Sequence, residues 1–220
     1  MHPQDNLSLF DVAVEQRPDP FLYEERARSL GFRLVAGVDE AGRGPLAGPV
    51  VAAAVILQPG RPMNGVTDSK AMTEKARERA FILICEQAAA LGIGVVPASY
   101  IDEHDILTAS LEAMRIAVSF LDPSPEFLLV DGNHQVPVRL PQKCLKKGDR
   151  LSRSISAASV IAKVYRDRIM CSCDKSFPGY GFTRHKGYGT RRHLSALKEL
   201  GPCRIHRKTF RGVIAPTVET

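Results

Sequence analysis

Apolar residues along the chain fall into two patterns, short unbroken runs and longer stretches with a helical period. The short runs predict strands, at Phe32–Val38, Val50–Leu57, Gly92–Tyr100, Phe127–Val130 and Gln142–Leu145. The periodic stretches predict helices, from Thr73 to Leu91, from Asp102 or Glu103 to Leu121, from Ser152 or Ser154 to about Cys173, and from Thr190 to Leu200. Two paired strands, followed by strands that alternate with helices, favour an α/β domain built on a mixed sheet.

The helix that starts at Ser152 or Ser154 has a clear apolar face. We expect its inward side chains to be Ala158, Ile161, Ala162, Tyr165 and Ile169. The first 31 residues differ from the rest, because Met1–Gly31 is polar and predicts an N-terminal extension with a short helix between Pro20 and Leu30. The remaining residues, 32–220, suit one large domain.

Composition excludes several classes of protein. Hydrophobic residues make up 44% of the chain and charged residues 25%, which are ordinary values for a soluble domain. The longest apolar run, Val50–Leu57, is far shorter than the roughly 20 residues of a membrane helix. The N-terminus lacks the pattern of a secretory signal, and five scattered cysteines do not form a disulfide framework. We therefore expect a reduced, cytoplasmic protein without a membrane span.

The net charge of +6 hides an uneven distribution of basic residues. From Arg139 to Arg211 the chain has 19 Lys or Arg and four acidic residues, a net charge of +15, whereas the rest carries −9. A strongly basic part beside an acidic remainder favours binding of a polyanion such as a nucleic acid. The alternative is a solvated basic face without a partner.

Three acidic residues stand at the ends of apolar strands. Asp39 and Glu40 follow the first run, and Asp131 follows the run that ends at Val130. A carboxylate there is costly unless it is paired or bound to metal, and oxygen ligands without a His/Cys cluster favour Mg²⁺ or Mn²⁺. Adjacent strand residues point to opposite faces, so Asp39 and Glu40 can share a site only if the strand frays or twists. Simple turn chemistry is the alternative for each motif taken singly.

The segment from Gly42 to Gly48 reads GRGPLAG. It is neither a Walker loop, since no Lys-Ser/Thr follows the last glycine, nor a dinucleotide fingerprint, since the glycine spacing differs and no helix follows. Its glycines could let main-chain groups approach a ligand closely, with Arg43 beside them. The alternative is a glycine-rich turn with a solvated arginine.

These residues carry a resemblance to a known family. The segment Val38–Val51, VDEAGRGPLAGPVV, closely resembles the first motif of ribonuclease HII, the type 2 ribonuclease H. The resemblance spans about Phe32 to Arg211 and includes further ordered motifs, at Asp68–Lys70, Val130–Asn133, Lys147–Asp149, Ser156–Asp167 and His185–Thr190.

The resemblance implies a fold and a chemistry. It implies the ribonuclease H-like fold, a mixed five-stranded sheet flanked by helices, with a helical C-terminal extension at about residues 150–211 that closes on the substrate. The family's four carboxylates map onto Asp39, Glu40, Asp131 and Asp149, which would hold two divalent ions, Mn²⁺ or Mg²⁺. Asp167 is a rival for the fourth role, but it lies inside a predicted helix, where we expect a structural ion pair.

The resemblance also implies the substrate, RNA–DNA hybrids and duplex DNA with embedded ribonucleotides, cut to leave 3′-hydroxyl and 5′-phosphate ends. The main chain of Gly42, Arg43 and Gly44 would read the 2′-hydroxyl, while Tyr188 would stack on the neighbouring deoxyribose. Basic residues that could contact phosphates are Lys70, Arg184 and Lys186. We expect a monomer. The competing hypotheses are another metal-dependent nuclease of the same fold and a non-catalytic module that binds hybrids.

The histidines and cysteines are not predicted to bind metal. Five histidines lack metal-ligand spacing and are expected to lie on the surface or to make hydrogen bonds, namely His104, His134, His185, His193 and His206. Cys171 and Cys173 lie two apart on a predicted helix, so they point to different faces and are expected to be inert.

Overall fold

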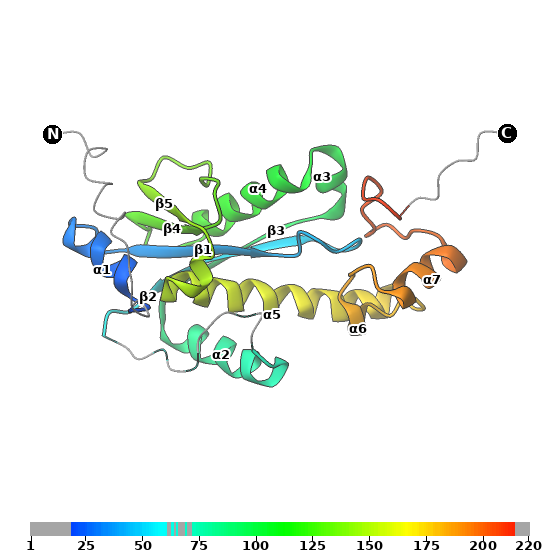
Figure 1. Cartoon of the computed structure of the whole chain (residues 1–220), viewed down its shortest axis with the longest axis horizontal. Coiled ribbons are helices and arrows are strands. Elements are labelled where there is room, and N and C mark those ends of the chain that lie inside the picture. The colour runs from blue at the N-terminus through cyan, green and yellow to red at the C-terminus, as the bar shows by residue number, and fades with distance from the viewer. Residues whose placement is uncertain (1–18, 61–62, 64, 66–68, 70–71, 214–220) are drawn as a thin grey trace.

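The computed structural model describes residues 19–60, 63, 65, 69 and 72–213. Its centre is one five-stranded sheet in the order β3-β2-β1-β4-β5 (Figure 1). The strands are β1 (Val35–Ala41), β2 (Val50–Leu57), β3 (Ala88–Val96), β4 (Phe127–Asp131) and β5 (Gln142–Leu145). Antiparallel pairs join β1 to β2 and β2 to β3, and parallel pairs join β1 to β4 and β4 to β5. The predicted mixed sheet is confirmed.

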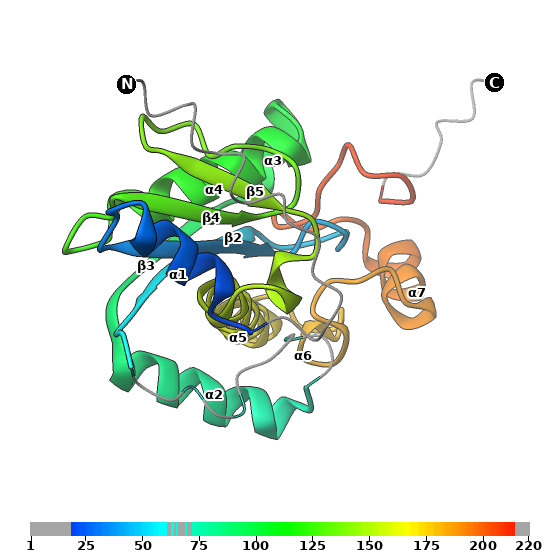
Figure 2. The same cartoon turned by 60° about the vertical axis from the view of Figure 1, so that its left-hand side comes forward.

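Helices cover both faces of this sheet, as Figure 2 shows. Apolar side chains of α4 (Ile106–Ser119) pack on one face, and those of α5 (Arg153–Ser176) and α2 (Glu74–Gln87) pack on the other. The side chains of β1 alternate between these layers, since Ala36 and Val38 belong to the α4 side and Val35 faces the opposite way. Every residue of β2 is buried, as expected for a central strand.

Several predicted boundaries are confirmed. The bounds of β2 and β5 agree with the predicted strands, and Thr73 and Ser152 cap α2 and α5 through their side chains. The last helix, α7 (Arg191–Leu200), begins after its predicted cap Thr190. Between α5 and α7 lies the short α6 (Phe182–His185), and the described chain has no helix long and apolar enough to cross a membrane.

The predicted boundary between α2 and β3 is wrong. The helix ends at Gln87, and Ala88–Leu91 belongs to β3, where Ala88 pairs with Leu57 and Leu91 pairs with Val55. Alanine and leucine have high helix propensity, but the hydrogen bonds offered by β2 outweigh that local preference. The strand also ends earlier than predicted, at Val96.

Two further helix predictions need correction. Ala98–Tyr100, for which the sequence pattern predicts the end of a strand, belong instead to the short helix α3 (Ala98–Glu103). The cap of α4 is Asp105 rather than Asp102 or Glu103, because its carboxylate accepts hydrogen bonds from the N–H groups of Leu107 and Thr108.

The buried face of α5 is rotated relative to the predicted face. Tyr165 is 38% exposed and Ile169 is half-buried, whereas Arg166 and Met170 are buried. The buried positions therefore continue at intervals of four, from Ala162 through Arg166 to Met170, which places the guanidinium of Arg166 inside the protein.

The N-terminal helix α1 (Leu22–Ser29) lies within the predicted range and packs on the domain. Ala27 is fully buried against the cluster that contains Val35 and Phe127. The buried Glu24 carboxylate accepts hydrogen bonds from the hydroxyl groups of Ser152 and Ser154 and from the N–H of Ser154. Helix α1 therefore helps to fix the start of α5.

Gly37 sets the distance between β1 and α5. A Cβ atom at Gly37 would lie 2.0 Å from the carbonyl carbon of Ser154 and 2.2 Å from the nitrogen of Ile155. Because both are main-chain atoms, we expect Gly37→Ala to lower the free energy of unfolding by about 2 kcal/mol or more, as overpacking does. Urea denaturation measures this change.

The matched control is Gly44→Ala. Its Cβ would meet only the Tyr188 ring, at 3.8 Å, so a change below about 1 kcal/mol is expected. Equal stability of the Gly37→Ala and wild-type proteins would contradict this account of the β1–α5 contact.

Candidate active site

The parallel pairing of β1 with β4 brings two predicted carboxylates together. Val38 is paired with Val130, so Asp39 and Asp131 follow at adjacent positions on neighbouring strands. Asp39 is 3% exposed, and its Oδ1 accepts the N–H of Glu40 at 2.7 Å. The two positions are 92 residues apart in the sequence, yet the sheet makes them neighbours.

Asp39 and Glu40 do not meet by fraying of the strand. The pairing of β1 with β2 continues without a break through Ala41, so the two side chains point to opposite faces of the sheet. Asp39 faces α5, where a hydrogen bond from Ser159 reaches it. Glu40 instead lines a cleft of about 100 Å³ with Asp131 and residues of α4. The strand therefore does not fray at these two residues, because the regular ladder to β2 is kept.

Asp131 connects the two faces. It is the last residue of β4, and its Oδ1 accepts the N–H of Gly148 at 2.7 Å. The same side chain lines the cleft of Glu40, so its charge acts on both Asp39 and Glu40. The predicted carboxylates thus form a row in which Asp131 interacts with the other two.

Burial and mutual repulsion make this row electrostatically unfavourable. Burial, then the charges of Glu40 and Asp131, raise the pKa of Asp39 well above its usual value. Burial also raises the pKa of Glu40, although the guanidinium of Arg43, 3.4 Å from its Oε1, opposes this change. A cation beside these carboxylates would reverse the penalty.

Asp149, the fourth predicted carboxylate, directly follows Gly148, whose N–H is hydrogen-bonded to Asp131. Asp149 lies in the 3-10 helix η2 (Gly148–Arg150) and is 6% exposed. Its neighbour Gly148 makes the hydrogen bond to Asp131, and a Cβ at Gly148 would lie 3.3 Å from Asp131 Oδ1. The turn before α5 therefore brings Asp149 to the same end of the sheet.

The donor set suits a hard divalent cation. All four side chains offer carboxylate oxygens, and those of Asp39 and Asp149 are buried. No group of three or more His, Cys, Asp or Glu in the described part of the chain is already arranged as a metal site. Charge and chemistry fit Mg²⁺ or Mn²⁺, whereas the structure does not show a finished coordination sphere.

The loop from Gly42 to Pro49, here called the reading loop because its first residues are predicted to contact a 2′-hydroxyl, lies beside this row of carboxylates. Gly42 has φ of +99°, and a Cβ there would lie 2.1 Å from Arg166 Nε, so glycine is required. Arg43 and Gly44 are exposed, and the Gly44 position faces the ring of Tyr188, which is 45% exposed. The loop and the tyrosine therefore lie together on the surface, as the proposed reading of a 2′-hydroxyl requires.

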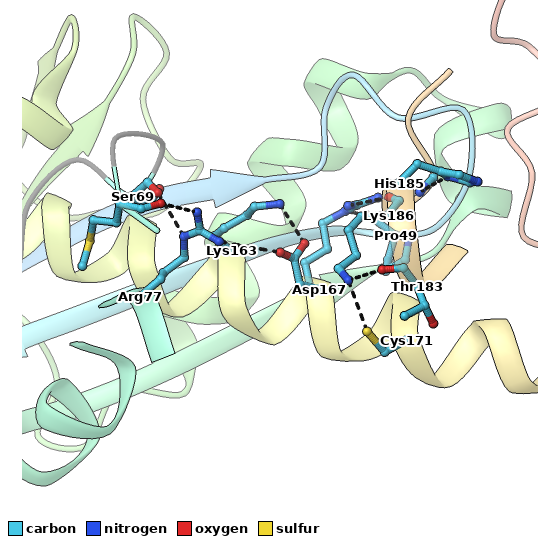
Figure 3. Close-up of polar contacts among 12 residues, drawn as sticks. Pro49, Ser69, Arg77, Lys163, Asp167, Cys171, Thr183, His185 and Lys186 are labelled. Carbon is cyan, nitrogen blue, oxygen red and sulfur yellow. Dashed lines mark hydrogen bonds and ion pairs between the residues drawn. The ribbon is translucent and has the colours of Figure 1, made fainter. Parts of the chain in front are cut away.

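The three basic residues predicted to contact phosphates differ in how far their side chains are available to a ligand. Arg184 is exposed on α6. The ammonium of Lys186 points back to its own segment, where it donates to the Thr183 carbonyl and to Cys171 Sγ (Figure 3). Lys70 lies outside the described residues.

The predicted structural role of Asp167 is supported by its contacts. Its Oδ1 accepts a hydrogen bond from Lys163 Nζ at 2.8 Å, and its Oδ2 lies 4.0 Å from Arg77 Nη1 (Figure 3). The predicted ion pair is confirmed.

Sequence reasoning missed a buried histidine cluster behind Tyr188. His193 and His206 are 0% and 1% exposed, and their Nε2 atoms lie 3.0 Å apart. His193 Nδ1 donates to the Tyr188 carbonyl, and His206 Nδ1 accepts the N–H of Cys203. Each ring must be neutral for this chain of hydrogen bonds to hold.

The chain is similar to known proteins of one family. The family model described as ribonuclease HII matches residues 36–213. Ribonuclease HII of Geotalea uraniireducens is 56% identical over 207 residues, covering 94% of this chain and 95% of that protein. The solved structure of ribonuclease H2 from Pyrococcus horikoshii OT3 has a TM-score of 0.70 at 27% identity, covering 82% of this chain and 95% of that one. A structure of a PCNA:RNase HII complex from Archaeoglobus fulgidus has a TM-score of 0.70 at 26% identity, covering 84% and 98%.

The histidine cluster predicts acid sensitivity. Burial is the main cause that lowers the pKa of His206 to about 4, and the charge of nearby His193 adds to it. The pKa of a histidine in the unfolded chain is about 6.5. As the pH falls between these values the unfolded state binds a proton that the folded state does not, so stability decreases. We expect the loss of unfolding free energy from about pH 7.5 to about pH 5 to be smaller in His206→Gln than in the wild-type protein.

The control is His104→Gln, because His104 is exposed and stacks on Tyr100. Urea denaturation at both pH values should show the wild-type acid sensitivity in this control. The same sensitivity in His206→Gln would rule out the cluster as its source.

Proposed function

The chain belongs to the ribonuclease HII family and is an endoribonuclease of the ribonuclease H type, and we propose that it cuts the RNA strand of RNA–DNA hybrids and the 5′ side of ribonucleotides embedded in duplex DNA. The observation that supports this most is the placement of Asp39 and Asp131 on adjacent parallel strands, beside a loop in which Arg43 and Gly44 are exposed. We also propose that the products carry 3′-hydroxyl and 5′-phosphate ends.

The carboxylates would act by holding divalent cations. In this proposal Asp39, Glu40, Asp131 and Asp149 hold two ions, Mn²⁺ or Mg²⁺, which would activate the attacking water and stabilise the leaving 3′-oxygen. The raised pKa values of Asp39 and Glu40 support this role, since a cation would relieve the repulsion among the acidic side chains.

The surrounding residues would select and orient the substrate. Arg43 and Gly44 are exposed, and their N–H groups would suit the oxygen of a 2′-hydroxyl, which alone distinguishes a ribonucleotide within a DNA strand. The exposed ring of Tyr188 offers an apolar surface to the next sugar. Phosphate contacts by Arg184 and other basic side chains would position the duplex without reading its sequence.

The domain division is part of the same proposal. Residues 32–220 would form the catalytic domain, with about residues 150–211 as the basic part that closes on the duplex, and residues 1–31 would precede it. Helix α7 and the segment after it lie beyond one end of the sheet (Figure 1) and support such an arrangement. Because the charge between Arg139 and Arg211 is strongly positive, this part suits a duplex backbone.

A paired cleavage assay tests the substrate. We expect a duplex with one ribonucleotide to be cut at that position, while an all-DNA duplex of the same sequence stays intact under the same conditions. The reason is that hydrogen bonds to the 2′-hydroxyl are lost in the all-DNA duplex. Equal cleavage of the two duplexes would favour a general nuclease of the same fold, and binding without cleavage would favour a non-catalytic module.

The carboxylate row has its own test. We expect Asp39→Asn and Asp131→Asn to lower kcat by about 100-fold or more, because each change removes a charge that would hold a cation worth several kcal/mol to the transition state. Chelation of divalent ions should abolish cleavage, and readdition of Mg²⁺ or Mn²⁺ should restore it.

Asp149 and Asp167 form a matched pair for the fourth carboxylate. Asp149→Asn should lose activity, whereas Asp167→Asn should keep kcat within about threefold, since its partly exposed ion pair contributes at most about 1 kcal/mol. The opposite ranking would assign the fourth role to Asp167. Full activity after exhaustive chelation would overturn the metal dependence.

A further inference from the structure

Two arginines behind the reading loop are buried without acidic partners. Arg166 of α5 is 1% exposed and Arg207, which follows α7, is 0% exposed. Neither makes an ion pair with a carboxylate in the described part of the chain. Their nitrogen atoms instead donate to main-chain carbonyls, those of Pro49, Lys186 and Ala47 for Arg166 and those of Gly48, Arg43 and Gly42 for Arg207.

Burying two guanidinium groups without carboxylate partners costs free energy, which indicates a functional role for them. Two guanidinium groups are buried near one another, and burial, together with the charge of Arg166, lowers the pKa of Arg207 to about 9. A buried charge is normally paired with an opposite charge. Here six carbonyl dipoles replace that partner, and five of them belong to the segment from Gly42 to Pro49.

The hydrogen bonds of Arg207 fix the orientation of two successive peptide groups. In a trans peptide the carbonyl of one residue and the N–H of the next point in opposite directions. Because the carbonyls of Gly42 and Arg43 point to Arg207, the N–H groups of Arg43 and Gly44 point away from it. Neither N–H has an acceptor among the residues that the structure describes. Two free donors therefore face outward, beside the Tyr188 ring.

Arg166 fixes the position of this loop relative to Tyr188. It bonds Ala47 and Pro49 on the loop and also the carbonyl of Lys186, two residues before Tyr188. The glycines of the loop permit the close approach, since a Cβ at Gly48 would lie 3.3 Å from Arg166 Nη2. Figure 3 shows Pro49 and Lys186 side by side at this point.

We infer that Arg207, assisted by Arg166, is a positioning residue for substrate selection, which holds the N–H groups of Arg43 and Gly44 as a fixed pair of donors to the ribose 2′-hydroxyl. This inference rests on the proposed function. Arg207 itself does not touch the substrate, because its guanidinium is enclosed by the protein. It acts by keeping the donors oriented before the substrate arrives, so that no peptide group has to turn on binding.

The test uses the intact enzyme with Mg²⁺ and two duplexes of the same sequence. The preference is the inhibition constant of the all-DNA duplex, used as a competitor, divided by KM for the duplex with one ribonucleotide. We expect Arg207→Lys to lower this preference by about tenfold, because lysine keeps the charge but lacks the planar fork whose separate nitrogens bond the carbonyls of Gly42 and Arg43. KM should rise, while the inhibition constant of the all-DNA duplex stays the same.

A merely structural role would give a different result. Partial unfolding lowers the concentration of active enzyme and therefore the apparent kcat, but it changes neither KM nor the inhibition constant. Arg166→Lys tests the same loop from its other side and should also lower the preference. The control is Arg211→Lys, since Arg211 is exposed on the same C-terminal segment and should leave the preference unchanged.

The outcomes separate the two levels of the argument. Cleavage that requires a ribonucleotide, with an unchanged preference in Arg207→Lys and Arg166→Lys, would overturn this inference and leave the proposed function standing. A wild-type enzyme without any preference for the ribonucleotide duplex would overturn the proposed function and the inference together. A reduced preference in both variants, with the control unchanged, would support the positioning role.

Discussion

The pairing of β1 with β4 is the constraint on which the site depends. A parallel ladder that matches Val38 with Val130 leaves the next residue of each strand, Asp39 and Asp131, at the same end of the sheet. The close approach of α5 to Gly37 then encloses Asp39, which raises its pKa together with the neighbouring charges. The core thus creates an acidic row that is stable only with a proton or a cation, and the same packing that stabilises the fold prepares the site for metal.

Positive charge lies near this acidic row, on the buried guanidinium groups of Arg166 and Arg207. The loop from Gly42 to Pro49 connects β1 to β2 and is enclosed from behind by Arg166 and Arg207. Buried positive charge on one side and carboxylates on the other place the loop between two fields of opposite sign. The carbonyls of Gly42 and Arg43 point to Arg207 and the N–H groups of Arg43 and Gly44 point outward, so this part of the loop offers donors to an anionic, oxygen-rich substrate.

Sequence patterns predicted the elements well where local preference and packing agree. The all-apolar runs gave β2 and β4, and the caps Thr73 and Ser152 gave two helix starts. They failed at Ala88–Leu91, where helix-forming residues pair with β2. The carboxylates could be named from motifs, but their arrangement on two faces of β1 depends on a ladder that no single motif encodes. The Lys70 assignment lies outside the described residues.

Arg166 and Arg207 were missed because their polar atoms are satisfied by main-chain groups that lie far away in the sequence, as in the bond from Arg207 Nη1 to the carbonyl of Arg43. The buried histidines were missed because His193 and His206 bond to each other across two segments that fold together. Composition assigns such arginines to a basic surface, because an unpaired arginine is rarely buried. Yet the period of α5 gave a clue, since Arg166 stands four residues after Ala162 and four before Met170, on a face that is otherwise apolar. A charged residue within an apolar face is therefore a reason to look for a distant partner, and here that partner is the loop beside the carboxylates.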